Sequence, residues 1–105
     1  KKDVINRGGL KIASVAVESA LYQHPAVREA AVIAAPHRDL GEDVAACVVL
    51  DPASNATRED LAAHCAAKLA DYEVPRRWLF LDELPKNPMG KILKTELRKL
   101  LEEAR

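Results

Sequence analysis

Apolar positions recur along this chain with two different spacings, and the change of spacing separates the expected strands from the expected helices. Segments 27–36 and 42–52 are apolar almost without interruption and rich in valine and alanine. Such runs are typical of strands buried on both faces. The polar segment 37–41 ends in a glycine and suits the turn between them. A further apolar run at 76–84 predicts a third strand.

Segment 14–24 predicts the first helix, because its apolar positions recur at helical spacing. Ser14 is placed to cap its start, and His24 ends it because the residue before Pro25 avoids the α-helical region. Ahead of this helix, two short apolar pieces flank Gly8-Gly9 and indicate a small hairpin. A glycine pair there implies positive φ or the close approach of another group. On the glycine pair alone, a plain hairpin turn is the favoured explanation.

The clearest helix is expected within residues 54–72. Thr57 is a good N-cap, and the acids at Glu59 and Asp60 suit the positive end of the helix dipole. The apolar stripe of this helix consists of Leu61, Cys65 and Leu69. After the third strand come a proline-rich loop, a strand-like piece at 91–93 and a last helix that opens at Thr95.

This order of elements predicts an α+β fold: a small sheet of about three strands with flanking helices plus an N-terminal hairpin. With 105 residues, the chain is long enough for one hydrophobic core and one domain. Apolar residues make up 49% and charged residues 30%, an ordinary globular composition. The chain does not begin with methionine, so we expect a piece of a longer protein.

The charge balance excludes some partners. Sixteen basic and sixteen acidic residues cancel, so the chain has no overall attraction to nucleic acid or to an anionic membrane. No apolar run approaches the roughly 18 residues of a membrane span. We therefore expect no nucleic-acid partner, no membrane span and a cytoplasmic location.

The cysteines and histidines give little sign of chemistry. Cys47 lies in an expected strand and Cys65 on an expected helix, and both are predicted to be reduced and buried. His64 precedes Cys65 directly, so the two side chains diverge on a helix and we expect no metal site. With His24 and His37 they form no recognisable Ser–His–Asp or Cys–His arrangement, and structural roles are expected for all three histidines.

Segment 84–94, LPKNPMGKILK, contains several turn-forming residues around one lysine, Lys91. Its two prolines restrict φ, Gly90 permits a tight bend, and the apolar pair at 92–93 can anchor the far side. Lys91 would then be a cation on a rigid projecting loop, suited to a phosphate or a developing negative charge. An ordinary solvated lysine is the alternative. Lys91 cannot catalyse alone, so partner groups must come from elsewhere.

Four segments together resemble one enzyme superfamily. Segment 84–98, LPKNPMGKILKTELR, resembles the C-terminal signature of adenylate-forming enzymes, which include acyl-CoA synthetases, adenylation domains of nonribosomal peptide synthetases and luciferases. Segment 1–12 resembles the stretch after the family's hinge, 17–50 its helix and two strands, and 69–85 its tyrosine-proline motif and third strand. The resemblance covers essentially the whole chain.

The resemblance implies a small C-terminal lid domain, residues 1–105, that closes over a large N-terminal domain absent from this chain. That large domain would bind ATP, its Mg²⁺ and the carboxylic acid. The implied activity is that of an ATP-dependent, AMP-forming carboxylate–CoA ligase, which gives acyl-AMP and then acyl-CoA. Lys91 is the implied catalytic residue, stabilising charge as the carboxylate attacks the α-phosphate. The isolated chain is predicted inactive, and the acid stays open.

The resemblance also assigns residues to a domain rotation that presents two faces in turn. Lys2 is the implied hinge, and Asp3 is the family's aspartate beside it. The channel for the pantetheine arm of CoA is assigned to Gly8, Gly9, Leu10 and the basic position Lys11.

Two positions depart from the family's pattern. Ala16 stands where the family often has a second acid beside Glu18. Glu73 stands where many acyl-CoA synthetases have a lysine that helps hold the CoA nucleotide, and Arg76 and Arg77 are nearby bases that could compensate. The change at Glu73 suits an alternative function, an adenylation enzyme that loads a carrier-protein thiol.

A third hypothesis is a non-catalytic interaction module. Such a module could cover a partner's site, or present Lys91 to a lysine acetyltransferase and deacetylase. In related synthetases acetylation of this lysine switches the enzyme off, and the loss of positive charge would explain the switch.

Overall fold

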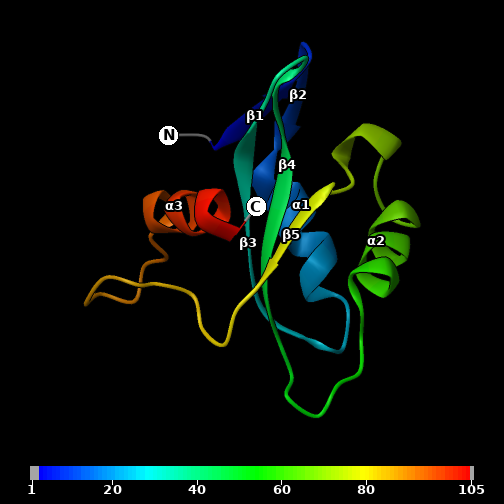
Figure 1. The fold of residues 1–105 in the computed structure, drawn as a ribbon. Helices are drawn as coiled ribbons and strands as arrows, with labels where there is room; N and C mark the ends of the chain where they lie inside the picture. The colour runs from blue at the N-terminus through cyan, green and yellow to red at the C-terminus, as the bar shows by residue number, and fades with distance from the viewer. Residues whose placement is uncertain (1–2, 105) are drawn as a thin grey trace.

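The computed structural model describes residues 3–104 and contains one five-stranded sheet with helices on both faces (Figure 1). Its centre is a long antiparallel pair, β3 (Val27–His37) and β4 (Gly41–Leu50), in which Val32 lies opposite Ala46. Gly41 enters β4 with a φ of 84°. The prediction of two buried strands joined by a short polar turn is therefore confirmed.

The N-terminal hairpin belongs to the same sheet. It consists of β1 (Val4–Arg7) and β2 (Leu10–Ala13), and β1 pairs with β4 at one position only, Arg7 opposite Gly41. The hairpin thus joins the three predicted strands in one sheet instead of standing beside it. The α+β class is confirmed, with five strands in place of about three plus a hairpin.

The third predicted strand is β5 (Arg77–Phe80), which pairs in parallel with the middle of β4, from Ala45 to Val48. A 3₁₀ turn, η1 (Asp71–Glu73), leads into it. The strand-like expectation for 91–93 is wrong: only Ile92 forms a bridge there, opposite Lys86.

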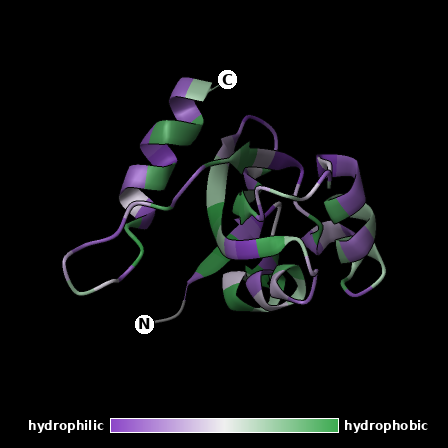
Figure 2. Ribbon diagram, turned by 90° about the horizontal axis from the view of Figure 1, so that it is seen from below, coloured by the Kyte–Doolittle hydropathy of each residue, from purple (hydrophilic) through white to green (hydrophobic). Residues whose placement is uncertain are grey.

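Three helices cover the two faces of the sheet. Helices α1 (Ser14–Tyr22) and α2 (Arg58–Ala66) lie on one face, and α3 (Lys94–Ala104) lies alone on the other (Figure 1). The outward side of α3 is hydrophilic, whereas its inward side carries apolar positions (Figure 2). No helix among residues 3–104 is long and apolar enough to cross a membrane.

The two faces enclose separate apolar clusters, because successive side chains of β3 and β4 point to opposite sides. Under α1 and α2 the buried residues include Ile5, Ile12, Val17, Leu21, Val32, Val44, Val48, Leu61 and Cys65. Under α3 they include Ala31, Ile33, Ala35, Ala45, Cys47, Leu84, Leu97 and Leu101. Both faces of the central strands are therefore covered, as the uninterrupted apolar runs predict.

The expected cap at Ser14 is wrong. Ala13 precedes α1 as its N-cap without a side-chain bond, and Ser14 is the first helical residue. The Ser14 hydroxyl donates instead to the carbonyl oxygen of Asp3 at 3.1 Å, and its N–H donates to the same oxygen at 3.0 Å. The serine is therefore used to hold the start of the chain.

The expected cap at Thr57 is confirmed and forms a full capping box. Its hydroxyl accepts from the Asp60 N–H at 3.1 Å, while the Asp60 carboxylate accepts from the Thr57 N–H at 2.9 Å. Hydrogen bonding from Thr57, chiefly from its backbone N–H and then from its side chain, lowers the pKa of the Asp60 carboxyl below its usual value.

Replacing Thr57 with alanine should lower the free energy of unfolding by about 1 kcal/mol, because the first turn of α2 loses its cap. Urea unfolding of the chain followed by circular dichroism measures the change. Ser54→Ala serves as a control, since Ser54 lies in the preceding loop and its hydroxyl accepts, among residues 3–104, only the local Ala56 N–H. An equal loss in both variants would contradict the capping role.

Cysteines and histidines occupy structural positions. Cys47 and Cys65 are free thiols buried on opposite faces of the sheet, and burial raises the pKa of each to about 11. His64 contacts His24 edge to face and bonds the Ala20 carbonyl at 2.7 Å, while His37 Nδ1 accepts two N–H groups of its own turn. The prediction of structural roles is therefore supported by contacts for all three histidines.

Candidate functional site

Residues 85–93, here called the lysine loop, project from the body of the domain beside α3 (Figure 1). Asn87 organises the loop: its N–H donates to the Lys91 carbonyl, and its own carbonyl accepts from the Gly90 N–H, both at 2.9 Å. The Asn87 side-chain oxygen accepts from the N–H groups of Met89 and Lys91, also at 2.9 Å. Asn87 thus takes part in four hydrogen bonds that fix the tip of the loop.

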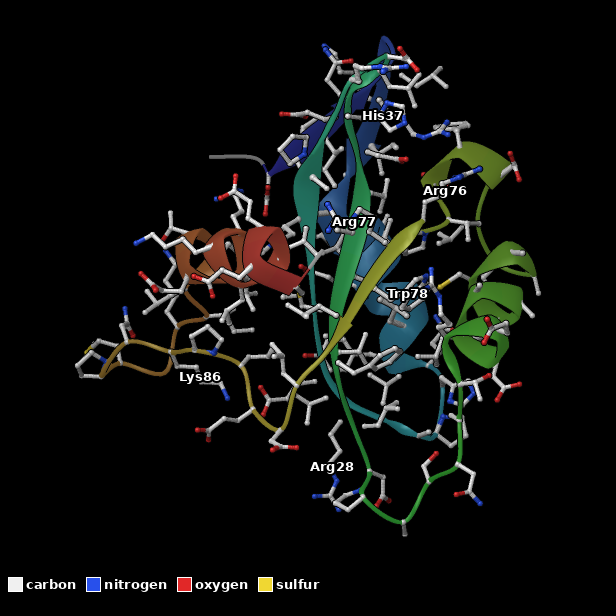
Figure 3. The ribbon with its side chains drawn as sticks, in the orientation of Figure 1. Arg28, His37, Arg76, Arg77, Trp78 and Lys86 are labelled. Carbon is white, nitrogen blue, oxygen red and sulfur yellow. The ribbon has the colours of Figure 1, made fainter. Side chains whose placement is uncertain are left out.

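The base of the lysine loop is fixed on both sides. The Leu93 N–H donates to the Pro85 carbonyl at 2.9 Å, and Leu84, just before the loop, is buried under α3. Lys86, labelled in Figure 3, pairs with Glu29 of β3 at 2.8 Å. Gly90 bends the tip with a φ of 87°, a value that suits glycine. The loop is therefore a defined structure that holds Lys91 in place.

Lys91 itself is exposed, and no ion pair to it occurs within residues 3–104. The lysines on either side, Lys86 and Lys94, are both paired with carboxylates. Because Lys91 has a rigid backbone and an unpaired ammonium in the described region, its charge is available to an anion brought from outside the domain.

Lys94, three residues after Lys91, is the centre of a polar cluster that the sequence did not reveal. Its ammonium pairs with the carboxylates of Asp3 and Glu18, the latter at 2.9 Å, and donates to the Val32 carbonyl at 3.0 Å. The ammonium also lies 3.4 Å from the Ser14 hydroxyl, so it contacts four polar partners among residues 3–104. The cluster joins the start of the chain, α1, β3 and α3.

The cluster shifts the protonation of its members. Burial alone would raise the pKa of Asp3, but the hydrogen bond and charge of Lys94 outweigh burial and lower it. Burial alone would lower the pKa of Lys94, but its hydrogen bonds to Asp3 and Glu18 outweigh burial and raise it. The cluster therefore favours the charged form of both residues. Of the two expected hinge residues, Asp3 is thus tied to the domain, while Lys2 lies outside the described residues.

Gly8 and Gly9 form the turn of the hairpin, here called the glycine turn. Their φ values of 57° and 95° agree with the predicted positive φ and are typical of a two-residue hairpin turn. The Gly9 N–H donates to the Asn6 side chain at 2.9 Å, and Leu10 and Lys11 beside it are exposed. The turn presents bare backbone to solvent.

The structure groups the candidate residues into two separate regions. Asp3 and Lys91 line one open groove with Lys94 and Arg98 at the base of α3. The glycine turn lies away from this groove, at the end of the sheet where β3 turns into β4 (Figure 1). One domain therefore presents a cation at one place and a glycine backbone at another.

Glu73, which replaces the lysine of many acyl-CoA synthetases, and the neighbouring Arg76 and Arg77 all form local structural contacts. The Glu73 carboxylate accepts from the Ala70 N–H at 2.9 Å and caps η1. Arg76 donates to the Val74 carbonyl at 2.8 Å and pairs with Asp71, and Arg77 donates to the Leu101 carbonyl at 3.2 Å (Figure 3). Glu73 thus has a local structural role in addition to any effect on a ligand.

Known proteins provide an independent comparison. The family model of the AMP-binding enzyme C-terminal domain matches residues 16–91. A peroxisomal benzoate–CoA ligase of Arabidopsis thaliana is 44% identical over 92% of this chain and 19% of its own length. A long-chain-fatty-acid–CoA ligase of Bacillus subtilis is 46% identical over 98% of this chain and 18% of its own.

Solved structures agree with the sequence relatives. MatB from Rhodopseudomonas palustris superimposes with a TM-score of 0.92 in both its apo and its ATP-bound crystal structures, at 35% and 34% identity, over 98% of this chain and 20% of MatB. The chain thus spans about a fifth of the length of the proteins it matches. By sequence and by fold, this chain belongs to the AMP-binding enzyme C-terminal domain family.

Proposed function

We propose that this chain is the mobile C-terminal domain of an ATP-dependent, AMP-forming carboxylate–CoA ligase, which makes acyl-AMP and then acyl-CoA. The observation that carries the proposal is the lysine loop. It holds the ammonium of Lys91 away from the domain body on a hydrogen-bonded turn, with no carboxylate partner within residues 3–104. A charge so presented suits an active site completed by another domain.

In the first half-reaction, a carboxylate oxygen of the acid attacks the α-phosphorus of ATP, and the bond from that phosphorus to pyrophosphate breaks. Negative charge accumulates around the α-phosphate in the transition state. Lys91 would stabilise it electrostatically, at no cost of reorganisation because Asn87 already fixes the loop. ATP and the acid would be bound by the large N-terminal domain.

In the second half-reaction, the CoA thiol attacks the acyl carbon and AMP leaves. The glycine turn would face the channel for the pantetheine arm, since backbone without side chains permits a close approach. Because the glycine turn and the lysine loop lie apart, the domain must rotate between the two steps. Asp3 is fastened to Ser14 and Lys94 and would move with the domain, so rotation on its N-terminal side, at Lys2, is favoured.

The proposal assigns no metal ligand to this domain. No three His, Cys, Asp or Glu side chains among residues 3–104 gather into a group that could hold a metal ion. The Mg²⁺ that accompanies ATP would therefore be held by the triphosphate and the large domain. What we propose this chain supplies to the α-phosphate is the cation of Lys91.

Glu73 supports a second candidate, an adenylation enzyme that transfers the acyl group to a carrier-protein thiol. A carboxylate at this place opposes the phosphates of the CoA nucleotide, whereas a phosphopantetheine arm on a carrier lacks that nucleotide. Comparing thioester yield with CoA and with a phosphopantetheinylated carrier protein separates the two acceptors. A strong preference for the carrier would replace CoA in the proposal.

Two further features of the proposal concern its setting. Exposure of Lys91 beside Gly90 leaves the lysine accessible to an acetyltransferase, and acetylation would remove the charge that adenylation needs.

We also propose a cytoplasmic location. Cell fractionation tests it by showing which fraction contains the full-length protein, since the Arabidopsis relative is named peroxisomal.

The direct test measures both half-reactions on the full-length protein. Acid-dependent exchange of labelled pyrophosphate into ATP reports adenylation across a panel of short, fatty and aromatic acids. Thioester formation from supplied acyl-AMP and CoA reports the second step. We expect both activities in the full-length protein and neither in the 105-residue chain alone. Absence of exchange with every acid would count against the ligase proposal.

A further inference from the structure

The glycine turn is braced by the tip of the neighbouring β3–β4 hairpin, near His37 in Figure 3. The Gly8 N–H donates to the Leu40 carbonyl at 2.9 Å, and the Asn6 N–H donates to the Glu42 carboxylate at 2.8 Å. A Cβ atom at Gly8 would lie 2.9 Å from the Leu40 side chain, so the two turns pack closely. The position of the glycine turn therefore depends on residues 32 or more positions later in the chain.

Asp43 supplies the charged part of this brace. The Arg7 guanidinium donates through Nε to the Asp43 carboxylate at 2.8 Å, and the Val44 N–H donates to the same carboxylate oxygen at 2.8 Å. The Asp43 side chain is 7% exposed and that of Arg7 is 19% exposed. A carboxylate this deeply buried is unfavourable without a cation, so Arg7 and Asp43 depend on each other.

This ion pair reinforces a sparse strand pairing. Strand β1 meets β4 at one backbone position only, Arg7 opposite Gly41. The side chain of the same Arg7 then reaches Asp43 on β4 and fixes the last residue of β1 directly before the glycine turn. Without the ion pair, the orientation of the turn would rest on the contacts of Asn6, Gly8 and the single Gly41 pairing.

We propose that Asp43 is a positioning residue for thioester formation: through Arg7 it holds the glycine turn where the thiol arm must pass. The proposal rests on the function proposed above. It assigns to Asp43 no contact with substrate and no part in adenylation, because the lysine loop lies elsewhere and shares no contact with the brace.

The test uses Asp43→Asn in the full-length protein. Asparagine keeps an acceptor for the Val44 N–H but removes the negative charge beside Arg7. We expect kcat/KM for CoA in thioester formation from supplied acyl-AMP to fall about tenfold, with pyrophosphate exchange within about twofold of wild type. Loss of both half-reactions to the same degree would mean that Asp43 only stabilises the fold, and would overturn the proposal.

The same turn offers a matched control. Asp39 pairs with Arg38 at 3.6 Å, but these side chains are 72% and 94% exposed, and among residues 3–104 neither forms a hydrogen bond or ion pair with the N-terminal hairpin. Asp39→Asn removes the same charge and should leave both half-reactions unchanged. A tenfold loss in this variant would attribute the effect to net charge at the tip and would contradict the role of Asp43.

A coupled variant tests the route through Arg7. Arg7→Met alone should resemble Asp43→Asn, and the double variant should be no worse than either, because each single change leaves a buried charge unpaired. If the loss of kcat/KM for CoA in the double variant equals the product of the two single losses, the two residues act independently, which would contradict the proposal.

Gly9→Ala separates this proposal from the proposed function. An alanine there meets no atom within 4 Å but is strained at a φ of 95°. If Gly9→Ala impairs thioester formation while Asp43→Asn does not, only the positioning role fails. If neither variant impairs it, the placement of the glycine turn at the thiol channel fails as well.

Discussion

Replacing Lys91 with alanine in the full-length protein should slow acyl-adenylate formation by about 10²–10³-fold, the usual effect of removing one preorganised electrostatic group. Thioester formation from supplied acyl-AMP should stay within about twofold of wild type. In the proposed mechanism Lys91 faces the α-phosphate only during adenylation, because the domain rotates before the thiol displaces AMP. The hydrogen bonds around Asn87 use the backbone of Lys91, so alanine should leave the loop folded.

Lys86→Ala is the matched control, since Lys86 lies in the same loop but is paired with Glu29 at 2.8 Å. Its adenylation rate should change little. Pyrophosphate exchange and single-turnover thioester formation measure the two steps separately. If both steps survive in Lys91→Ala, the lysine is an ordinary surface residue and the proposed mechanism is wrong for this protein.

Replacing Lys94 with methionine should destabilise the 105-residue chain by about 2 kcal/mol, because two carboxylates then face each other without their shared cation. The Lys94 side chain is 24% exposed, and the Glu18 side chain 19%, so water compensates only in part. Urea unfolding at neutral pH measures the loss. Lys99→Met is the control: the Lys99 side chain is 70% exposed and its ammonium lies 3.6 Å from the Glu96 carboxylate, so a change within about 0.5 kcal/mol is expected.

The pH dependence of stability provides a second readout of the Lys94 cluster. The folded pKa of Asp3 is lowered below its usual 3.8, so its contribution is complete above about pH 4 and is lost as the pH falls through the lower folded value. The folded pKa of Lys94 is raised above 10.5, so its contribution is present below that pH and is lost above it. Lys94→Met should remove both dependences, and an unchanged acid limb in the variant would contradict the pairing.

Local patterns in the sequence were sufficient for much of the fold. The uninterrupted runs at 27–36 and 42–52 predicted two strands covered on both faces, and Thr57 predicted the start of α2. The lysine loop was also readable, because prolines and a glycine act on the backbone within a few residues. In each case the cause and its effect lie close together in the chain.

What the sequence did not reveal depends on residues far apart in the chain. Lys94 meets Asp3 across 91 positions, and Arg7 meets Asp43 across 36, so no local spacing indicates either contact. Ser14 was misassigned for the same reason: its hydroxyl is used by Asp3, which tertiary packing brings beside it. The parallel partnership of β5 with β4 likewise follows from the path of α2 between them.

The burial of both thiols has a practical consequence for spectroscopy. With pKa values of about 11, Cys47 and Cys65 carry little thiolate at neutral pH and should react slowly with maleimides. Met89, at the tip of the lysine loop, is 90% exposed. A cysteine introduced there would be the reactive thiol of this domain, so a fluorophore at Met89→Cys in the full-length protein tests in real time whether the domain moves, as proposed, when ATP, acid and CoA are added.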